Sequence, residues 1–295
     1  MNAIGIRRIP LLSNDDAWQR LPGAPELSQQ LPMWARMFVG PLPLTTARAL
    51  ELDAMHRSGD RLDGRLRALV RWAAADANGC NASKKQAIAD FRRTGSTEEL
   101  TTLAMTPGEQ SAVAFARRLM AEAYAITDDE MKLLAEFFTE EQVVGLVALL
   151  AHASYQDRII LALGAAEDEV TPPPVTVRFA RPKPTAAPPT PILPADPTAI
   201  TTDRERFQTG IDSQKTRPGH IRIPSHGEAL RRMGDGHPMA WQVGLAWSRV
   251  CYGFQPELTD AWFACTGAFR QETDLDMVFQ NAVFWVITES LQCFY

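Results

Sequence analysis

The chain has 295 residues, of which 45% are hydrophobic and 22% are charged, with a formal net charge of -5 and a sequence pI near 5.6. This composition is typical of a soluble globular protein, and the length allows two domains of ordinary size, so a disordered chain is excluded. The negative charge, together with the lack of a basic stripe interleaved with aromatic residues, argues against nucleic acid as a partner.

No segment predicts secretion or membrane insertion. Residues 1–10 include Arg7 and Arg8 but no following apolar run, so they do not resemble a secretory signal. The most apolar stretch, residues 143–163, is interrupted by polar and charged side chains, which favours a buried helix over a membrane span. We therefore expect a cytoplasmic protein without a membrane partner.

The first 165 residues are predicted to form consecutive helices. Four segments begin with the capping-box spacing, in which a side-chain oxygen accepts a hydrogen bond from an otherwise unpaired amide. These segments begin at Ser96, Thr106, Thr127 and Thr139. Apolar residues then recur at intervals of three and four, and no strand signal competes. The expected helices span residues 44–57, 63–79, 83–93, 97–104, 107–125, 128–137 and 140–163.

A proline-rich segment separates the two halves of the chain. Ten of the 21 prolines lie between Pro172 and Pro197. Proline fixes φ and removes a backbone donor, so residues 166–220 are predicted to be an extended linker. Beyond it, residues 221–295 are expected to form helices over 227–233, 238–252, 256–269 and 274–293. The predicted fold is all-α, with helical domains at 1–165 and 221–295.

One short pattern occurs twice. Six residues recur at matching positions, each pair 213 residues apart: leucine, aspartate, valine, tryptophan, a carboxylate and cysteine. The repetition predicts two copies of one helical unit. The two tryptophans are expected to anchor cores. The first copy is Leu62, Asp63, Val70, Trp72, Asp76 and Cys80, and the second is Leu275, Asp276, Val283, Trp285, Glu289 and Cys293.

The two thiols that close these copies are the candidate site. Cys80 and Cys293 are the predicted nucleophiles, because a thiolate attacks peroxide when a helix N-terminus or a nearby cation lowers its pKa. The alternative for a lone cysteine at a helix end is a small buried hydrophobic residue. Asp76 and Glu289, one turn earlier, are candidate proton acceptors for the thiols. The alternative for each carboxylate is an exposed or ion-paired group, with Arg71 and Lys84 as the candidate partners.

The four cysteines, at positions 80, 251, 265 and 293, are too scattered for a disulfide framework or a zinc site. Free thiols are therefore expected, with no cofactor. His152, on an otherwise apolar stretch, is interpreted as a satisfied interior histidine and not as a base.

The segments at 65–80, 112–119, 141–150 and 157–158 resemble the carboxymuconolactone decarboxylase and AhpD-like alkylhydroperoxidase family. The resemblance covers about residues 44–164 and again about 225–295. It implies two AhpD-like helical domains, self-association into homo-oligomers, and a peroxidase or thiol-disulfide oxidoreductase activity. The implied partners are a small-molecule peroxide and a thiol reductant.

The chain departs from the family signature, which is glutamate, eleven residues, cysteine, two residues, cysteine, three residues and histidine. Its four positions fall on Ala68, Cys80, Ser83 and Ala87, so one of the four is retained. Because serine cannot form a disulfide, an oxidised Cys80 would need another thiol to resolve it. In the second copy the later signature positions fall beyond Tyr295, so we expect that domain to be incomplete at its C-terminal end.

Local charges around Cys80 oppose one another. Ser83 is a candidate cap for the next helix, and its positive end, with Lys84 and Lys85, would favour the thiolate. The negative charge of Asp76 would disfavour it.

Three functions therefore remain open from the sequence. The first is peroxidase or thiol-disulfide chemistry, and the second is a catalytically inactive family member that acts as an assembly or binding module. The third is decarboxylation of a muconolactone-type acid, which requires a basic pocket and a proton donor that no cluster in the sequence identifies.

Overall fold

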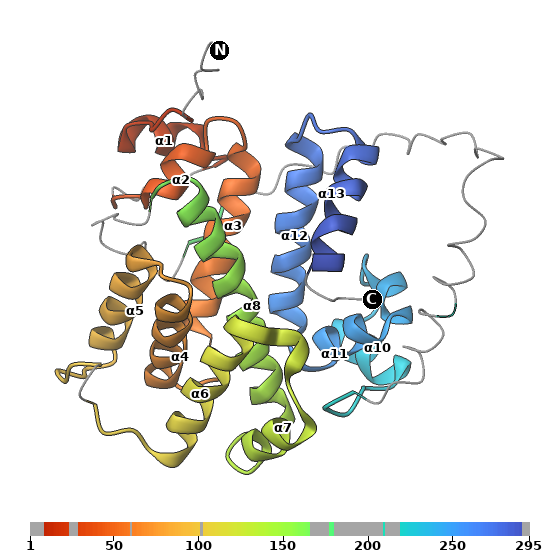
Figure 1. Ribbon diagram of the computed structural model, residues 1–295. Helices are drawn as coiled ribbons and strands as arrows, with labels where there is room; N and C mark the ends of the chain where they lie inside the picture. The colour runs from red at the N-terminus through yellow and green to blue at the C-terminus, as the bar shows by residue number, and fades with distance from the viewer. Residues whose placement is uncertain are drawn as a thin grey trace. The chain divides into compact units, whose positions relative to one another are not determined.

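The computed structural model describes residues 9–23, 29–59, 61–100, 103–165, 177–179, 209 and 219–290, without the side chains of residues 289 and 290. Within these residues the fold is all-α and contains no strand, as predicted (Figure 1). The first eight helices are α1 (Asn14–Arg20), α2 (Met33–Phe38), α3 (Pro43–Ser58), α4 (Gly64–Ala77), α5 (Asn81–Arg93), α6 (Pro107–Glu122), α7 (Asp128–Ala135) and α8 (Glu140–Ala162). The later helices are α10 (His226–Met233), α11 (Ala246–Phe254), α12 (Pro256–Glu272) and α13 (Met277–Ser290), with short 3-10 helices η1 (Ala123–Ala125) and η2 (Ala240–Gly244).

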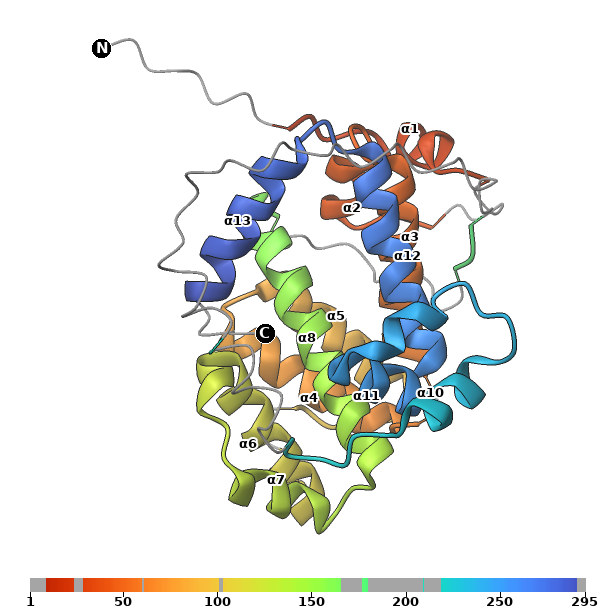
Figure 2. The same cartoon turned by 90° about the vertical axis from the view of Figure 1, so that its right-hand side faces the viewer.

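The chain forms two compact units whose boundaries differ from the predicted domains. Residues 1–182 and 221–272 form one unit, and residues 183–220 and 273–295 form the other. Helices α10 to α12 therefore belong with α1 to α8, and α12 packs along α3 (Figures 1 and 2). The Glu272 carboxylate, which ends α12, accepts hydrogen bonds from the Leu44 and Thr45 amides at 2.6 and 2.7 Å. It thereby caps the first turn of α3 from a distant part of the sequence.

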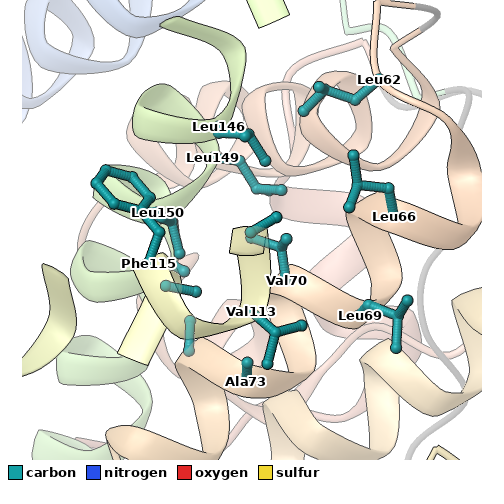
Figure 3. Close-up of a cluster of buried hydrophobic side chains, with 14 of the residues drawn as sticks. Leu62, Leu66, Leu69, Val70, Ala73, Val113, Phe115, Leu146, Leu149 and Leu150 are labelled. Atoms are coloured by element: carbon teal, nitrogen blue, oxygen red, sulfur yellow. The ribbon is translucent and has the colours of Figure 1, made fainter. Parts of the chain in front are cut away.

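The main core lies where α4 meets α6 and α8. Apolar side chains recur along one side of α4 at helical spacing, and Figure 3 shows them facing side chains from the other two helices. The cluster is buried from solvent, which is the main source of stability for this part of the fold. Its central members are Leu66, Leu69, Val70 and Ala73 from α4, Val113 and Phe115 from α6, and Leu146, Leu149 and Leu150 from α8.

Three of the four predicted capping boxes are confirmed. Thr106, Thr127 and Thr139 each accept from the amide three residues later, and the side chain at that position returns a bond to the cap amide. The helix predicted over 97–104 is wrong, because the described residues of this segment are not helical. Arg65 of α4 binds the segment instead, with Nη2 donating to the Ala104 carbonyl at 3.1 Å.

The helices after residue 220 agree in type with the prediction but differ in detail. Helix α10 begins with a capping box formed by Ser225 and Glu228, which the sequence analysis did not identify. The helix predicted over 238–252 is divided into η2 and α11, because Leu245 adopts an extended conformation between them.

Most of the predicted linker lies outside the described residues, so its extended conformation stays a prediction. The short part at 177–179 belongs to the core of the first unit. There the Phe179 amide donates to Glu51 Oε1 at 2.6 Å, and its ring stacks on Trp18 with centroids 6.3 Å apart. The core of the first unit thus extends into the predicted linker.

Both copies of the repeated pattern begin a helix in the same way. Asp63 accepts from the Arg65 and Leu66 amides at the start of α4, and Asp276 Oδ1 accepts from the Phe279 amide at 2.9 Å at the start of α13. The predicted pair of helices is therefore present. Among the described helices none is long and apolar enough to cross a bilayer.

Candidate functional site

Cys80 lies between α4 and α5, at the N-cap of α5. Gly79 adopts a left-handed φ of 69°, and this reversal lets the Cys80 amide donate back to the Ala75 carbonyl at 2.9 Å. Ser83, which was predicted to cap this helix, lies within its first turn instead, because α5 begins at Asn81. The predicted placement of the thiol at a helix N-terminus is therefore confirmed, and the predicted cap is wrong.

The Cys80 thiol is fully buried and neutral. Its exposed fraction is 0%, and it contacts the apolar cluster that also contains residues of α1 to α3. The Sγ atom donates to Ser83 Oγ at 3.3 Å. Burial raises the pKa of Cys80, and it outweighs the hydrogen bonds from Ser83, which lower the pKa, while the negative charge of Asp157 raises it further. The thiolate that peroxide chemistry needs is disfavoured here.

Asp76 is a surface carboxylate. It accepts from Lys84 Nζ at 2.7 Å and lies 4.0 Å from the Arg117 guanidinium. The two cations also lie over the Trp72 ring, each 5.9 Å from its centroid. The predicted pairing of Asp76 with Lys84 is confirmed, and the contacts of Asp76 support this ion-pair role and not proton acceptance from Cys80.

The second predicted site cannot be placed. Cys293 and the side chain of Glu289 lie outside the described residues. The two other described thiols, Cys251 and Cys265, are free, and burial raises the pKa of each to about 11. No described thiol has the lowered pKa of a reactive cysteine.

The structure instead assembles a buried polar network next to Cys80. Arg71, predicted as a partner of Asp76, turns inward and binds both oxygens of Asp157 and, at 3.1 Å, Gln156 Oε1. Asn78 Nδ2 also donates to Asp157, at 2.8 Å. Burial alone would raise the pKa of Asp157, but Arg71 and the hydrogen bonds from Asn78 and Ser83 lower it. Asp157 is therefore ionised and links α4, α5 and α8.

The network continues to Asp53 on α3. Gln156 Nε2 donates to Asp53 Oδ1 at 3.1 Å, and Arg57 Nη1 donates to Oδ2 at 3.3 Å. Burial alone would raise the pKa of Asp53, but the His152 hydrogen bond and the charge of Arg57 lower it. Arg57 also forms a two-point ion pair with Asp90 of α5, at 2.8 and 2.9 Å. Ionised carboxylates and arginines thus alternate across the interior.

Two histidines complete the site. The rings of His56 and His152 stack 4.4 Å apart at an angle of 13°. Burial lowers the pKa of His56 well below its usual value, and the adjacent His152 lowers it further, so the His56 ring is neutral at pH 7. Both rings line a cavity of about 300 Å³ between α3, α4, α5 and α8. Other lining residues are Arg57, Arg67, Ala68 and Arg71.

Sequence reasoning did not identify most of this cluster. Asp53, His56 and Arg57 lie three and four residues apart on the helix predicted over 44–57, and this spacing on one face was the available signal. His152 and Gln156 lie four residues apart on the predicted helix over 140–163, and Asp157 follows Gln156 directly. The sequence analysis interpreted His152 as an interior histidine but did not connect it with the other two. Which groups meet depends on how α3, α4 and α8 pack.

Within the described ranges, no group of three or more histidine, cysteine or acidic side chains is placed to hold a metal ion. Comparison of the chain with protein-family models, with curated proteins and with solved structures found no match.

Proposed function

We propose that this protein is a member of the carboxymuconolactone decarboxylase and AhpD-like family whose first domain is a small-molecule binding module without thiol chemistry. The observation that supports this is the state of Cys80, which is fully buried and donates its hydrogen to Ser83 at 3.3 Å. Only one of the four signature positions carries the family residue, and Ser83 stands where the signature has its second cysteine, so this position has no sulfur to close a disulfide with Cys80.

The contacts of Ser83 explain why a serine is compatible with this state. Its hydroxyl also hydrogen-bonds to Asp157, so the thiol, the hydroxyl and the carboxylate form one chain of hydrogen bonds. A thiolate at Cys80 would place a second negative charge near Asp157 in a buried environment, which is unfavourable. Burial and the charge of Asp157 keep the sulfur protonated, although the hydrogen bonds from Ser83 lower the pKa of Cys80.

Peroxidase or thiol-disulfide chemistry is the second candidate function. It is favoured by the position of Cys80 at the N-cap of α5, because the helix dipole stabilises an anion there. Cys293, outside the described residues, is the other candidate thiol for this activity.

Peroxide titration with free-thiol counting separates the two candidates. We expect Cys80 in the native chain to be oxidised far more slowly than in the same chain unfolded in guanidinium, which serves as the reference for unprotected thiols. Mass spectrometry of the digested protein assigns each loss to one cysteine. Rapid stoichiometric oxidation of Cys80 or Cys293 in the native chain would establish the redox candidate instead.

The variant Ser83→Cys provides a matched test of the missing signature residue. Because the Cys80 sulfur and the Ser83 oxygen already lie 3.3 Å apart, a second sulfur at this position is close enough to form a disulfide after small side-chain rotations. We expect mild oxidation to remove both thiols, at positions 80 and 83, from this variant. In the unmodified chain, which has a serine at position 83, the Cys80 thiol should remain free.

Self-association is part of the proposal. It is supported by the family resemblance and by the exposed apolar side chains of α13, which include Phe284, Val286 and Ile287. Light scattering of the purified chain should give a mass above that of one chain, and a compact monomer would contradict this part.

A further inference from the structure

Two histidines of this protein face an aspartate, and they differ in the use of the second ring nitrogen. His237 Nε2 lies 3.0 Å from Asp260 Oδ2, and its Nδ1 accepts from the Met239 amide at 3.2 Å. His152 Nε2 lies 3.5 Å from Asp53 Oδ1, but its buried Nδ1 has no hydrogen-bond partner among the described residues. An ionised carboxylate only accepts, so in a neutral imidazole ring the nitrogen that faces it carries the hydrogen and the other nitrogen is an acceptor. His152 Nδ1 therefore presents an unused lone pair.

His152, which carries this unused acceptor, lines a cavity. Leaving a buried acceptor unpaired is unfavourable, and such groups in native proteins are satisfied by protein groups, ordered water or a bound ligand. His152 is only 4% exposed, and it lines the cavity of about 300 Å³ together with His56. That volume lies at the lower end of the range typical of small-molecule pockets.

The charge of the wall indicates the kind of ligand. Four arginines and two aspartates line the cavity, and Asp157 behind the wall pairs with Arg71, so the charged groups leave an excess of one positive charge. Arg57 is fixed by its ion pairs with Asp53 and Asp90, and Arg71 is fixed by Asp157, so the charged groups are held in place before any ligand enters. A carboxylate is the common small anion whose planar shape matches guanidinium groups.

We propose that this cavity binds a small hydroxycarboxylate, whose hydroxyl donates to His152 Nδ1 and whose carboxylate lies against the arginine-lined wall. The proposal rests on the proposed function of the first domain as a binding module, and it names the ligand class. The neutral His56 ring, stacked on His152, covers one side of the acceptor and leaves the excess positive charge of the wall to the arginines.

Matched acid pairs test the hydroxyl contact directly. The full chain is titrated with malate and succinate, and with mandelate and phenylacetate, while ligand-observed NMR and calorimetry measure affinity. We expect at least one hydroxy acid to bind about tenfold or more tightly than its counterpart, because the latter leaves the acceptor unpaired. Mandelamide, which keeps the hydroxyl and lacks the charge, should bind more weakly than mandelate.

The variant His152→Phe removes the acceptor and keeps a flat ring in the same place. It should abolish the preference for the hydroxy acid. His237→Phe is the matched control, since His237 has the same kind of aspartate partner but a satisfied Nδ1, and it should retain the preference. Should His152→Phe fail to fold, ¹⁵N spectra of the histidine rings in the unmodified chain provide the same test. Hydroxy acid addition should move the His152 Nδ1 resonance and leave that of His237 unchanged.

Equal affinity for both members of each acid pair, or no binding of any probe at millimolar concentration, would overturn the proposal. So would an equal response of the two histidine resonances. These outcomes are independent of thiol reactivity, which is tested by peroxide alone. Rapid oxidation of Cys80 with an intact preference for the hydroxy acid would overturn the proposed function and support the proposed binding site. Slow oxidation without the preference would support the proposed function and overturn the binding site.

Discussion

Helices α4 and α13 carry the same sequence pattern and have different environments. Each begins with an aspartate that accepts from amides of the first turn. Val70 of α4 is 0% exposed, whereas Val283, which occupies the matching position of α13, is 40% exposed. The next position is the buried Arg71 in α4 and Phe284, 66% exposed, in α13. A repeated local pattern thus determines a helix, and it does not determine what the helix packs against.

The difference follows from the neighbours that each unit provides. The apolar side of α4 meets complementary side chains from α6 and α8, which remove it from water (Figure 3). Its inward-turned arginine finds Asp157 on α8. In α13 the matching positions are apolar and remain exposed among the described residues of its own unit. Substitutions at paired positions therefore measure the contribution of tertiary packing.

The largest expected difference is between Val70→Asp and Val283→Asp. The first places a carboxylate in the main core without a partner and should lower the free energy of unfolding by more than about 4 kcal/mol. The second introduces a charge at a partly exposed position and should change stability by less than about 0.5 kcal/mol. Chemical denaturation followed by circular dichroism measures both. Similar losses in the two variants would show that α13 is buried in solution.

Arg71→Met should be nearly as damaging, because it leaves Asp157 buried without its cation. We expect a loss of about 3–5 kcal/mol, and the double variant Arg71→Met with Asp157→Leu should recover most of it. At the matching position, Phe284→Met should have little effect. Lack of recovery in the double variant would mean that Asn78 and Ser83 depend on Asp157 as much as Arg71 does.

The pH dependence should be confined to the first unit. The pKa of His56 is lowered well below its ordinary value of 6.5, so the unfolded chain binds this proton more tightly than the folded one. Above pH 6.5 His56 is neutral in both states and does not reduce the free energy of unfolding. Below pH 6.5 the unfolded chain takes up the proton first, so the free energy of unfolding should fall by about 1.4 kcal/mol for each pH unit, until the pH reaches the pKa of His56 in the folded chain.

Denaturant midpoints between pH 7.5 and 5 test this dependence on His56. The variant His56→Gln should show a flatter profile over the same range, while hydrogen exchange in α13, which has no histidine, should not follow the same profile. An equal slope in the variant would assign the effect to another group.

The smallest effects are expected at the two helix starts. Asp63→Ala removes a cap from a packed helix and should cost about 1 kcal/mol of global stability. Asp276→Ala removes the equivalent cap from α13, where less packing holds the first turn. It should therefore appear as faster amide exchange at the start of α13, with no change in the unfolding midpoint of the first unit. A shift of that midpoint would show that α13 contributes to the first unit.

Much of the helical content followed from local signals. The capping threonines at positions 106, 127 and 139 specify helix starts through bonds that close within four residues, so the sequence pattern was sufficient. The same signal at Ser96 did not produce a helix, and Arg65 from a different helix binds the Ala104 carbonyl at the end of that segment. Leu245 divided a predicted helix through an extended backbone that propensity did not indicate.

The candidate site was less accessible from sequence. The N-terminal position of Cys80 on α5 was predicted, because Asn78 and Gly79 end the preceding helix. The sequence left open whether the thiol is a nucleophile or a buried hydrophobic group, because its burial depends on the packing of α1 to α3 around it.

Amino-acid order alone determined most of the helices, the aspartates that begin α4 and α13, and the sulfur that ends the first copy of the repeated pattern. Tertiary structure decided which side chains meet. It turned Arg71 inward to Asp157, stacked His56 on His152 and left one ring nitrogen of the cavity-lining His152 without a hydrogen-bond partner among the described residues. The physical reason is range: a helix cap closes within one turn, whereas the burial and pairing of a charge depend on residues up to about a hundred positions away, such as Asp53 and Gln156.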